Sequence, residues 1–194
     1  MKVGVLALQG DFEAHGRRLE ELGAEPVYVR RANELDGLAG LILPGGESTT
    51  MLKFLEGDGL FEALQTFAAK HPVMGTCAGA ILMASEVLRP PQRSLGLMDM
   101  TIERNAYGRQ LDSHIAGLEA SPAFAERAGQ VPVEAVFIRA PIIRRVGPQA
   151  QVLLEHQGDA VLVEQGRHLA VTFHPELSAD KRVHQLFLEK VSNQ

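Results

Sequence analysis

Short apolar segments alternate with amphipathic segments along the first half of the chain, and this alternation is the strongest constraint on its fold. The strand-like segments are 2–8, 26–30, 40–43 and 73–76, and the helical segments are 11–22, 47–55, 60–70 and 77–87. Strands joined through helices form right-handed crossovers, which produce a mostly parallel sheet with helices on both faces. We therefore expect an α/β fold.

The second half of the chain has a different character, because strand-like runs follow one another with few helices between them. The expected strands are 97–103, 133–139, 142–146, 152–156, 160–165 and 169–173, and a closing helix is expected over 179–192. The pair Gly158-Asp159 stands between two of these runs as a hairpin turn, so we expect an antiparallel extension of the sheet. No segment has the length or composition of a linker, and residues 1–194 are expected to form a single domain.

Composition narrows the function classes. Hydrophobic residues make up 45% of the 194 residues, charged residues 22%, and the net charge is −5, with no basic stripe of the kind that binds nucleic acid. No apolar run reaches the roughly 20 residues that span a bilayer, so no membrane partner is expected. A single cysteine excludes an internal disulfide and suits a cytoplasmic protein. The histidines show no metal-ligand spacing, so no metal site is expected.

That single cysteine, Cys77, lies in a distinctive context. The apolar run 73–76 leads directly into Gly75-Thr76-Cys77-Ala78-Gly79, and a helix of small residues follows. A strand, a tight turn and a helix in this order form a nucleophile elbow, in which the nucleophile is lifted above the end of the strand. At the helix N-terminus, unpaired N–H groups favour a thiolate over a thiol. Cys77 is therefore the candidate nucleophile.

A candidate base for this nucleophile follows the last predicted strand. The strand 169–173 ends in His174-Pro175-Glu176, and the proline keeps His174 out of the helical region. Glu176 is close enough in sequence to fix the imidazole tautomer and to stabilise the imidazolium. Because the carboxyl ends of parallel strands gather at one edge of an open sheet, we expect these residues to meet Cys77 there. The sequence thus predicts a Cys77–His174–Glu176 triad.

Three further segments can complete a site of this type. The glycine-rich turn Pro44-Gly45-Gly46-Glu47-Ser48 lacks the lysine of a phosphate-binding loop. Beside an elbow, its backbone N–H groups and that of Ala78 can form an oxyanion hole. Arg104 follows one predicted strand and Arg139 ends another, and arginine binds carboxylates through a planar fork of donors.

Taken together, these motifs resemble the class I, or triad, glutamine amidotransferases. Within that class the chain is similar to the family of glutaminase subunits of pyridoxal 5′-phosphate synthase. The blocks that carry this similarity span nearly the whole chain: 6–10 (LALQG), 43–50 (LPGGESTT), 75–79 (GTCAG), 103–105 (ERN), 107–110 (YGRQ), 137–141 (FIRAP) and 173–177 (FHPEL). The resemblance implies a flavodoxin-like three-layer sandwich.

The resemblance also implies roles for individual residues. Cys77 attacks the side-chain amide of L-glutamine, His174 shuttles the proton and Glu176 orients the imidazole. The residues implied to bind glutamine are Gly46, Glu47, Ser48, Arg104, Ile138 and Arg139, and the backbone of Gly46 and Ala78 is implied to form the oxyanion hole. No cofactor is implied. The implied partner is a barrel-shaped synthase subunit of the PdxS type in a hetero-oligomer, with Gln9 and Gly10 near the mouth of the site.

Two other functions compete with this interpretation. A glutaminase that serves a different synthase, such as one that makes imidazole glycerol phosphate, has the same triad, so only the partner distinguishes it. A redox-sensing or chaperone-like protein on a similar fold also carries an elbow cysteine. Proteins of that second class lack a His-Pro-Glu sequence after the last strand, and here it is present.

Overall fold

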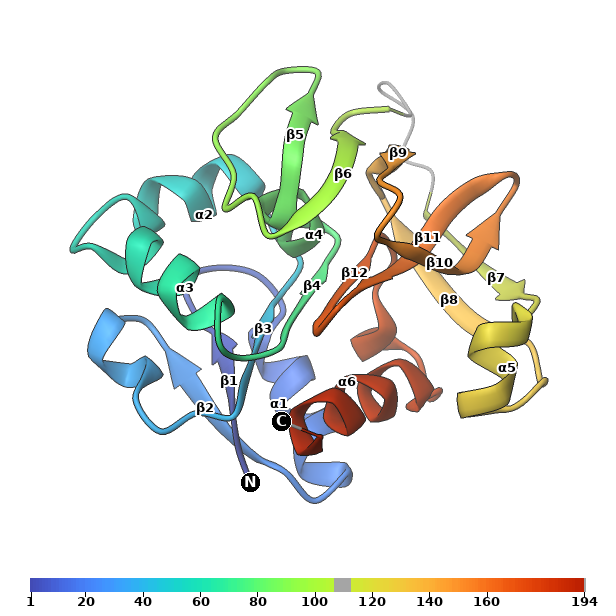
Figure 1. Cartoon of the computed structure of the whole chain (residues 1–194), viewed down its shortest axis with the longest axis horizontal. Coiled ribbons are helices and arrows are strands. Elements are labelled where there is room, and N and C mark those ends of the chain that lie inside the picture. Colours follow the sequence, from blue (N-terminus) through green and yellow to red (C-terminus); the bar gives the residue numbers. More distant parts are fainter. Residues whose placement is uncertain (107–112, 194) are drawn as a thin grey trace.

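The computed structural model of the chain describes residues 1–106 and 113–193. Five parallel strands lie side by side in the order β2, β1, β3, β4 and β12, and β11, β9, β6 and β5 extend the same sheet, with β10 paired to β11 (Figure 1). The parallel strands are β1 (Lys2–Leu6), β2 (Glu25–Val29), β3 (Gly40–Leu43), β4 (Val73–Thr76) and β12 (His168–Val171). The extension contains β5 (Ala84–Leu88), β6 (Met98–Glu103), β9 (Ile142–Val146), β10 (Gln151–His156) and β11 (Asp159–Gln165).

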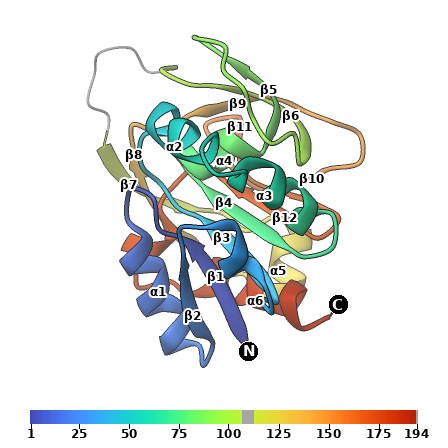
Figure 2. The same ribbon diagram turned by 90° about the vertical axis from the view of Figure 1, so that its left-hand side faces the viewer.

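Helices cover both faces of the parallel strands (Figures 1 and 2). On one face, α2 (Ser48–Leu55), α3 (Leu60–Ala68) and the short α4 (Ala78–Met83) pack through a core that includes Met51, Phe61 and Leu82. On the other face, α1 (Phe12–Glu21) and α6 (Arg182–Ser192) pack through a core that includes Leu19, Leu186 and Phe187. The expected three-layer α/β architecture with an antiparallel extension is confirmed.

The prediction of a helix over 77–87 is wrong for its second half. Helix α4 ends at Met83, and Ala84–Leu88 forms β5, which pairs in parallel with β6. The Ser85 hydroxyl also donates a hydrogen bond to the Met100 carbonyl across this pair. The apolar residues after Cys77 fit either a buried helix or a buried strand, and pairing with the next strand, β6, decides between them.

Elements between 113 and 128 were not expected from the sequence. A separate two-stranded sheet joins β7 (Ser113–Leu118) to β8 (Val133–Ile138), and α5 (Pro122–Ala128) lies between these strands. The start of α5 does carry a recognisable signal, because the Ser121 hydroxyl accepts from the Phe124 N–H and Pro122 occupies the first turn. The hairpin expected at 158–159 forms between β10 and β11.

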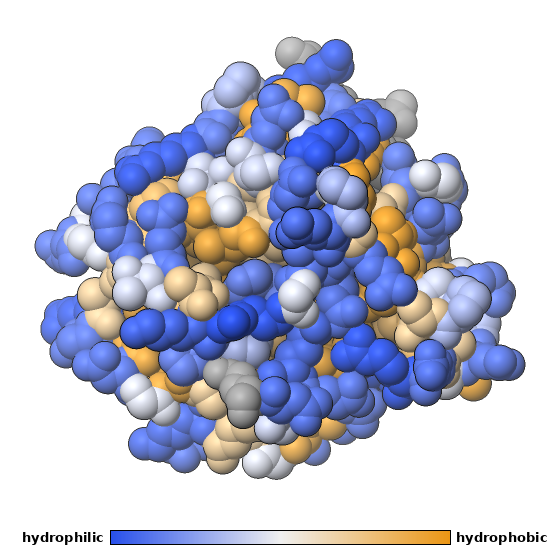
Figure 3. All heavy atoms as spheres, in the orientation of Figure 1, coloured by the Kyte–Doolittle hydropathy of each residue, from blue (hydrophilic) through white to orange (hydrophobic). Residues whose placement is uncertain are grey.

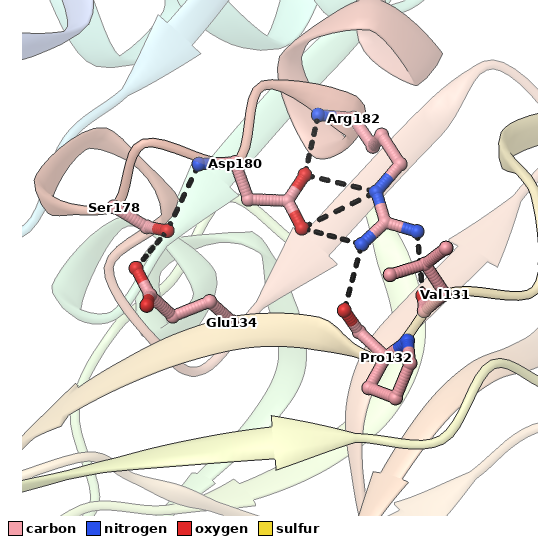
Figure 4. Close-up of polar contacts among 6 residues, drawn as sticks. All are labelled: Val131, Pro132, Glu134, Ser178, Asp180 and Arg182. Atoms are coloured by element: carbon pink, nitrogen blue, oxygen red, sulfur yellow. Dashed lines mark hydrogen bonds and ion pairs between the residues drawn. The ribbon is translucent and has the colours of Figure 1, made fainter.

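A polar clamp joins the start of α6 to the start of β8 (Figure 4). The Arg182 guanidinium donates to the backbone carbonyls of Val131 at 2.6 Å and Pro132 at 2.9 Å, and it also pairs with Asp180. Asp180 accepts the Arg182 backbone N–H as well, so α6 begins at Arg182 rather than at the expected residue 179. Ser178 donates to Glu134 at 2.7 Å. The clamp fixes the turn after His174 relative to the β7–β8 ribbon.

The surface is mainly hydrophilic when viewed along the direction of Figure 1, with separate areas where hydrophobic side chains show (Figure 3). Among the helices of the described residues, none combines the length and the apolar character needed to cross a bilayer.

Candidate active site

Cys77 occupies the sharp turn between β4 and α4. Its backbone has φ of 48° and ψ of −106°, a strained conformation for a residue with a side chain, and its N–H donates to the Val171 carbonyl at 2.8 Å. A Cβ atom added to Gly79 would lie 1.9 Å from the Leu43 carbonyl oxygen, and one added to Gly75 would lie 2.6 Å from the Gly79 backbone. The small flanking residues are therefore required by the close approach of backbone to backbone.

The Cys77 thiol and the His174 imidazole lie beside each other above Gly45. A Cβ added to Gly45 would lie 2.5 Å from Cε1 of His174 and 3.5 Å from Cβ of Cys77. Both side chains are almost completely buried. Burial disfavours the charged imidazole, but hydrogen bonds with Cys77 and Glu176 and the negative charge on both groups outweigh it and raise the pKa of His174 to about 10. The arrangement therefore favours a protonated imidazole beside the sulfur of Cys77.

Glu176 holds the far side of the imidazole. It lies in the short 3₁₀ helix η2 (Pro175–Leu177), and its Oε1 is 2.6 Å from Nδ1 of His174. Burial raises the pKa of the Glu176 carboxyl, but the neighbouring imidazoles of His15 and His174 hold it well below its usual range. An ionised carboxylate accepts a hydrogen bond from the Nδ1–H group and so leaves Nε2 of His174 to exchange protons with the thiol.

A cavity of about 310 Å³ opens in front of these two side chains. Nearly all of the residues expected at the site line it: Gly46, Glu47, Ser48, Cys77, Ala78, Arg104, Ile138, Arg139 and His174. Asp11, Ile81, Asn105, Ala106, Ala140 and Pro141 line it too and were not expected as site residues. Glu176 lies behind His174, outside the lining.

The glycine-rich turn between β3 and α2 forms one wall of the cavity. Glu47 caps α2 by accepting the Thr50 N–H at 3.1 Å, and its other carboxylate oxygen lies 3.3 Å from the buried guanidinium of Arg104. Burial alone raises the pKa of Glu47, but hydrogen bonds from Thr49 and Thr50 and the charge of Arg104 bring it below its usual value. This wall therefore presents an ionised carboxylate and a guanidinium side by side.

Gln9 and Gly10 support this wall from behind. The Gln9 side-chain oxygen accepts the Glu47 N–H at 2.7 Å. Gly10 has a φ of 92°, and a Cβ added there would overlap the Gly45 carbonyl oxygen at 1.7 Å. The two residues contact the turn directly but do not line the cavity.

The opposite wall comes from the end of β8. Arg139 has a φ of 46°, and the Ile138 carbonyl oxygen lies 4.0 Å from the Cys77 sulfur. This wall continues the β7–β8 ribbon that the clamp of Figure 4 holds against the Glu176 turn.

A comparison with protein families gives a match of residues 5–193 to the SNO glutamine amidotransferase family. The chain belongs to that family. It is 58% identical over 190 residues to the pyridoxal 5′-phosphate synthase subunit PdxT of Solibacter usitatus, covering 98% of this chain and 99% of the relative. It is 52% identical to the PdxT subunit of Deinococcus radiodurans over 97% of this chain and 96% of the relative.

Solved structures agree with this membership. A crystal structure described as a glutamine amidotransferase superposes on this amidotransferase with a TM-score of 0.89 and 43% identity, covering 98% of both chains. A putative GMP synthase subunit from Thermoplasma acidophilum reaches a TM-score of 0.73 at 16% identity, covering 100% of this chain and 94% of that chain. This second likeness concerns the fold alone.

Some parts of the amidotransferase site were not anticipated, and one lies outside the described residues. The block 107–110 falls in that undescribed part of the chain. Gly45 was quoted within a motif, but its contact with His174 follows only from the fold. His15 on α1 contacts Glu176, and His184 on α6 contacts His15; neither histidine has a sequence signal beyond its burial on a helix face.

One group of three potential metal ligands occurs among the described residues, and it consists of Asp11, His174 and Glu176, whose ligand atoms all lie within 4.8 Å of one another. His174 and Glu176 are already hydrogen-bonded to each other, and a protonated imidazole has no lone pair for a metal. We assign no metal to the site, and the absence of a bound metal there remains a prediction.

Proposed function

We propose that this amidotransferase hydrolyses L-glutamine to glutamate and ammonia and supplies the ammonia to a pyridoxal 5′-phosphate synthase. One observation carries the proposal: the side chains of Cys77 and His174 line the same cavity, and the Glu176 carboxylate lies 2.6 Å behind the imidazole, in a member of a glutamine amidotransferase family. The relatives named as subunits of this synthase support its placement in that enzyme.

In the proposed mechanism the Cys77 thiolate attacks the side-chain carbonyl carbon of glutamine. The carbonyl oxygen becomes an oxyanion, which accepts hydrogen bonds from the backbone N–H groups of Gly46 and Ala78. The His174 imidazolium gives its proton to the amide nitrogen, ammonia leaves and a γ-glutamyl thioester remains. A water molecule then attacks the thioester as His174 takes its proton. Glutamate departs and the thiolate–imidazolium pair is restored.

The charged walls of the cavity suit the other end of the substrate. The α-carboxylate of glutamine is complementary to the guanidinium groups of Arg104 and Arg139, and the α-ammonium group is complementary to Glu47. Ser48 and the backbone of Ile138 complete the proposed glutamine-binding set, together with Gly46. No cofactor enters this mechanism.

The proposed partner is a barrel-shaped synthase subunit of the PdxS type, bound in a hetero-oligomer in the cytoplasm. Gln9 supports the proposal that docking acts on the oxyanion loop, because its amide holds the N–H of Glu47, next to Gly46. We infer that this subunit alone is a poor glutaminase and that the partner activates it. We also propose that residues 1–194 act as one domain, since the proposed site draws on both halves of the chain.

The test is glutamate release by the purified subunit with and without the synthase subunit. Replacement of the nucleophile, Cys77→Ala, should lower the rate of glutamine hydrolysis by about three orders of magnitude or more, which is typical of losing a nucleophile. Synthesis by the complex from added ammonia should persist, because the partner performs that step. Full glutamine turnover by Cys77→Ala contradicts the nucleophile assignment, and activation by a different acceptor enzyme contradicts the partner.

A further inference from the structure

Two fully buried histidines lie behind Glu176, on the side away from His174. His15 is on α1 and His184 is on α6, and they are 169 residues apart in sequence. Nδ1 of His15 lies 2.9 Å from Nε2 of His184, while Nε2 of His15 lies 3.4 Å from Oε2 of Glu176 and 3.1 Å from the Thr76 hydroxyl. Thr76 immediately precedes the nucleophile. The proposed triad therefore continues into a buried chain of polar contacts.

The hydrogen-bonding capacity of Glu176 makes this contact significant. Its Oε1 is used by His174, and its Oε2 is buried without a conventional hydrogen bond from any described residue. A buried carboxylate oxygen with no donor is costly. Nε2 of His15 lies 3.4 Å from Oε2 and 3.1 Å from the Thr76 hydroxyl, so an N–H on that atom can be shared between the hydroxyl and the carboxylate oxygen.

The contacts also select one tautomer for each histidine. A carboxylate only accepts hydrogen bonds, so Nε2 of His15 must carry its proton to contact Glu176 favourably. Nδ1 of His15 is then an acceptor, and the Nε2–H of His184 donates to it. In the opposite arrangement a lone pair of His15 would face the carboxylate, and an N–H on Nδ1 of His184 would be buried with no acceptor among the described residues.

On this geometry, and given the proposed glutaminase function, we propose that His15 is a positioning residue for Glu176. Its Nε2–H, shared with the Thr76 hydroxyl, faces the second carboxylate oxygen, and His184 fixes the tautomer that makes this possible. Neither histidine touches the substrate. Their role is to keep the carboxylate ionised and aligned on His174, so that the imidazolium partner of the Cys77 thiolate is stabilised.

The charges around the two rings agree with neutral histidines. Burial lowers the pKa of His15 and is only partly offset by the charges of Glu176 and Asp11, while His174 adds to the lowering. Burial, helped by the neighbouring His15 and Arg18 and opposed by the charge of Glu176, lowers the pKa of His184 to about 3. Neutral donors stabilise the carboxylate without placing a second cation beside the His174 imidazolium.

The first test measures the reactivity of Cys77 without any glutamine. Because Cys77 is the only cysteine, iodoacetamide consumption by the full chain reports this thiol alone. In His15→Ala, the loss of alignment should move the acidic limb of the alkylation–pH profile upward by about one pH unit. In His15→Gln, whose amide retains a donor, the limb should return at least halfway to that of the parent. Unmoved profiles in folded His15→Ala overturn the proposal.

The second test uses turnover by the complex with its synthase subunit. His15→Ala should lower kcat by about tenfold to a hundredfold, as is common when the support behind a functional side chain is removed, and should leave KM within about twofold. The matched control is Leu19→Ala, which removes a core side chain from the same helix without touching Glu176. It should lower the Tm yet keep the parent pH profile. If Leu19→Ala moves the profile as much as His15→Ala, the effect is structural and the proposal is wrong.

The third test uses the parent chain and therefore does not depend on the folding of a variant. In the parent chain, ¹⁵N shifts of labelled histidines should show His15 as the neutral Nε2–H tautomer between pH 6 and 8. An Nδ1–H tautomer or an imidazolium at His15 contradicts the proposal. This measurement and the alkylation profile do not involve glutamine, so they separate failure of this inference from failure of the glutaminase function.

Discussion

Nδ1 of His174 lies 2.6 Å from Oε1 of Glu176, only two residues further along the chain. The proline between them starts a short 3₁₀ helix that folds the carboxylate back onto the imidazole. A local turn thus builds the half of the triad that contains two charges, and the fold has only to bring Cys77 to the other side of the ring.

The first prediction concerns that contact. Glu176→Gln keeps the shape of the side chain but can present its amide N–H₂ to His174, which favours the wrong tautomer. We expect kcat for glutamine hydrolysis by the complex to fall by about a hundredfold to ten-thousandfold. KM should stay within about twofold, because Glu176 does not line the cavity. The exposed Glu62→Gln is the control, and a collapse of glutamine binding in Glu176→Gln would instead make Glu176 a substrate ligand.

Gly45 supplies a steric prediction. In Gly45→Ala the new methyl group would lie 2.5 Å from Cε1 of His174, so the imidazole must move away from Cys77. A displacement of this size should lower kcat/KM by about a hundredfold. Gly57→Ala is the matched control, since its nearest neighbour would be an ordinary contact at 3.5 Å. Equal activity of the two variants would show that the imidazole has room to shift without loss.

The ion pair in the wall of the cavity leads to a prediction about substrate affinity. Arg104→Ala removes a buried guanidinium that faces the cavity and contacts Glu47 at 3.3 Å. We expect the KM for glutamine to rise by about tenfold to a hundredfold, the loss expected for a charged hydrogen bond. The exposed Arg145→Ala, which breaks an ion pair with Asp99, should leave KM unchanged. A fall in kcat at constant KM would instead show that Arg104 acts in the chemical step and not in glutamine binding.

Acid stability should depend on the buried histidine pair. The pKa of His184 is lowered from 6.5 in the unfolded chain to about 3 in the folded protein, with burial as the main cause. Below pH 6.5 the unfolded chain therefore binds a proton that the folded protein does not, and the stability is progressively lost as the pH falls towards 3. The Tm of the parent should decrease between pH 6.5 and 4.

His184→Gln should flatten this decrease, because glutamine does not titrate. Thermal melts at several pH values provide the measurement. Leu186→Ala, a core change on the same helix, is the control and should lower the Tm by a similar amount across the range. An equally steep fall in His184→Gln would assign the acid sensitivity to other groups.

Much of the fold and of the proposed site could be predicted from local patterns. Strand β4 and helix α4 flank Cys77 because small residues permit a tight turn there, and Pro175 sets the geometry at His174. Gly46 and Glu47 follow β3, which ends at the same edge of the parallel sheet as β4, so they line the same cavity as Cys77. Arg104 and Arg139 line it too, from the end of β6 and from the separate β7–β8 ribbon. Both parts of the proposed triad, the cysteine turn and the His-Pro-Glu turn, could be predicted because each depends on a few neighbouring residues.

Tertiary structure decided what local patterns leave open. The segment Ala84–Leu88 is a strand because β6 offers it backbone partners, although its sequence also suits the end of a helix. Gly45 lies against His174 and His15 lies against Glu176 only because helices and strands from distant parts of the chain pack together. The sequence alone determined which residues can perform the chemistry and which turns present them. Packing determined which buried groups support them, because such contacts depend on the relative placement of whole elements and leave no local pattern.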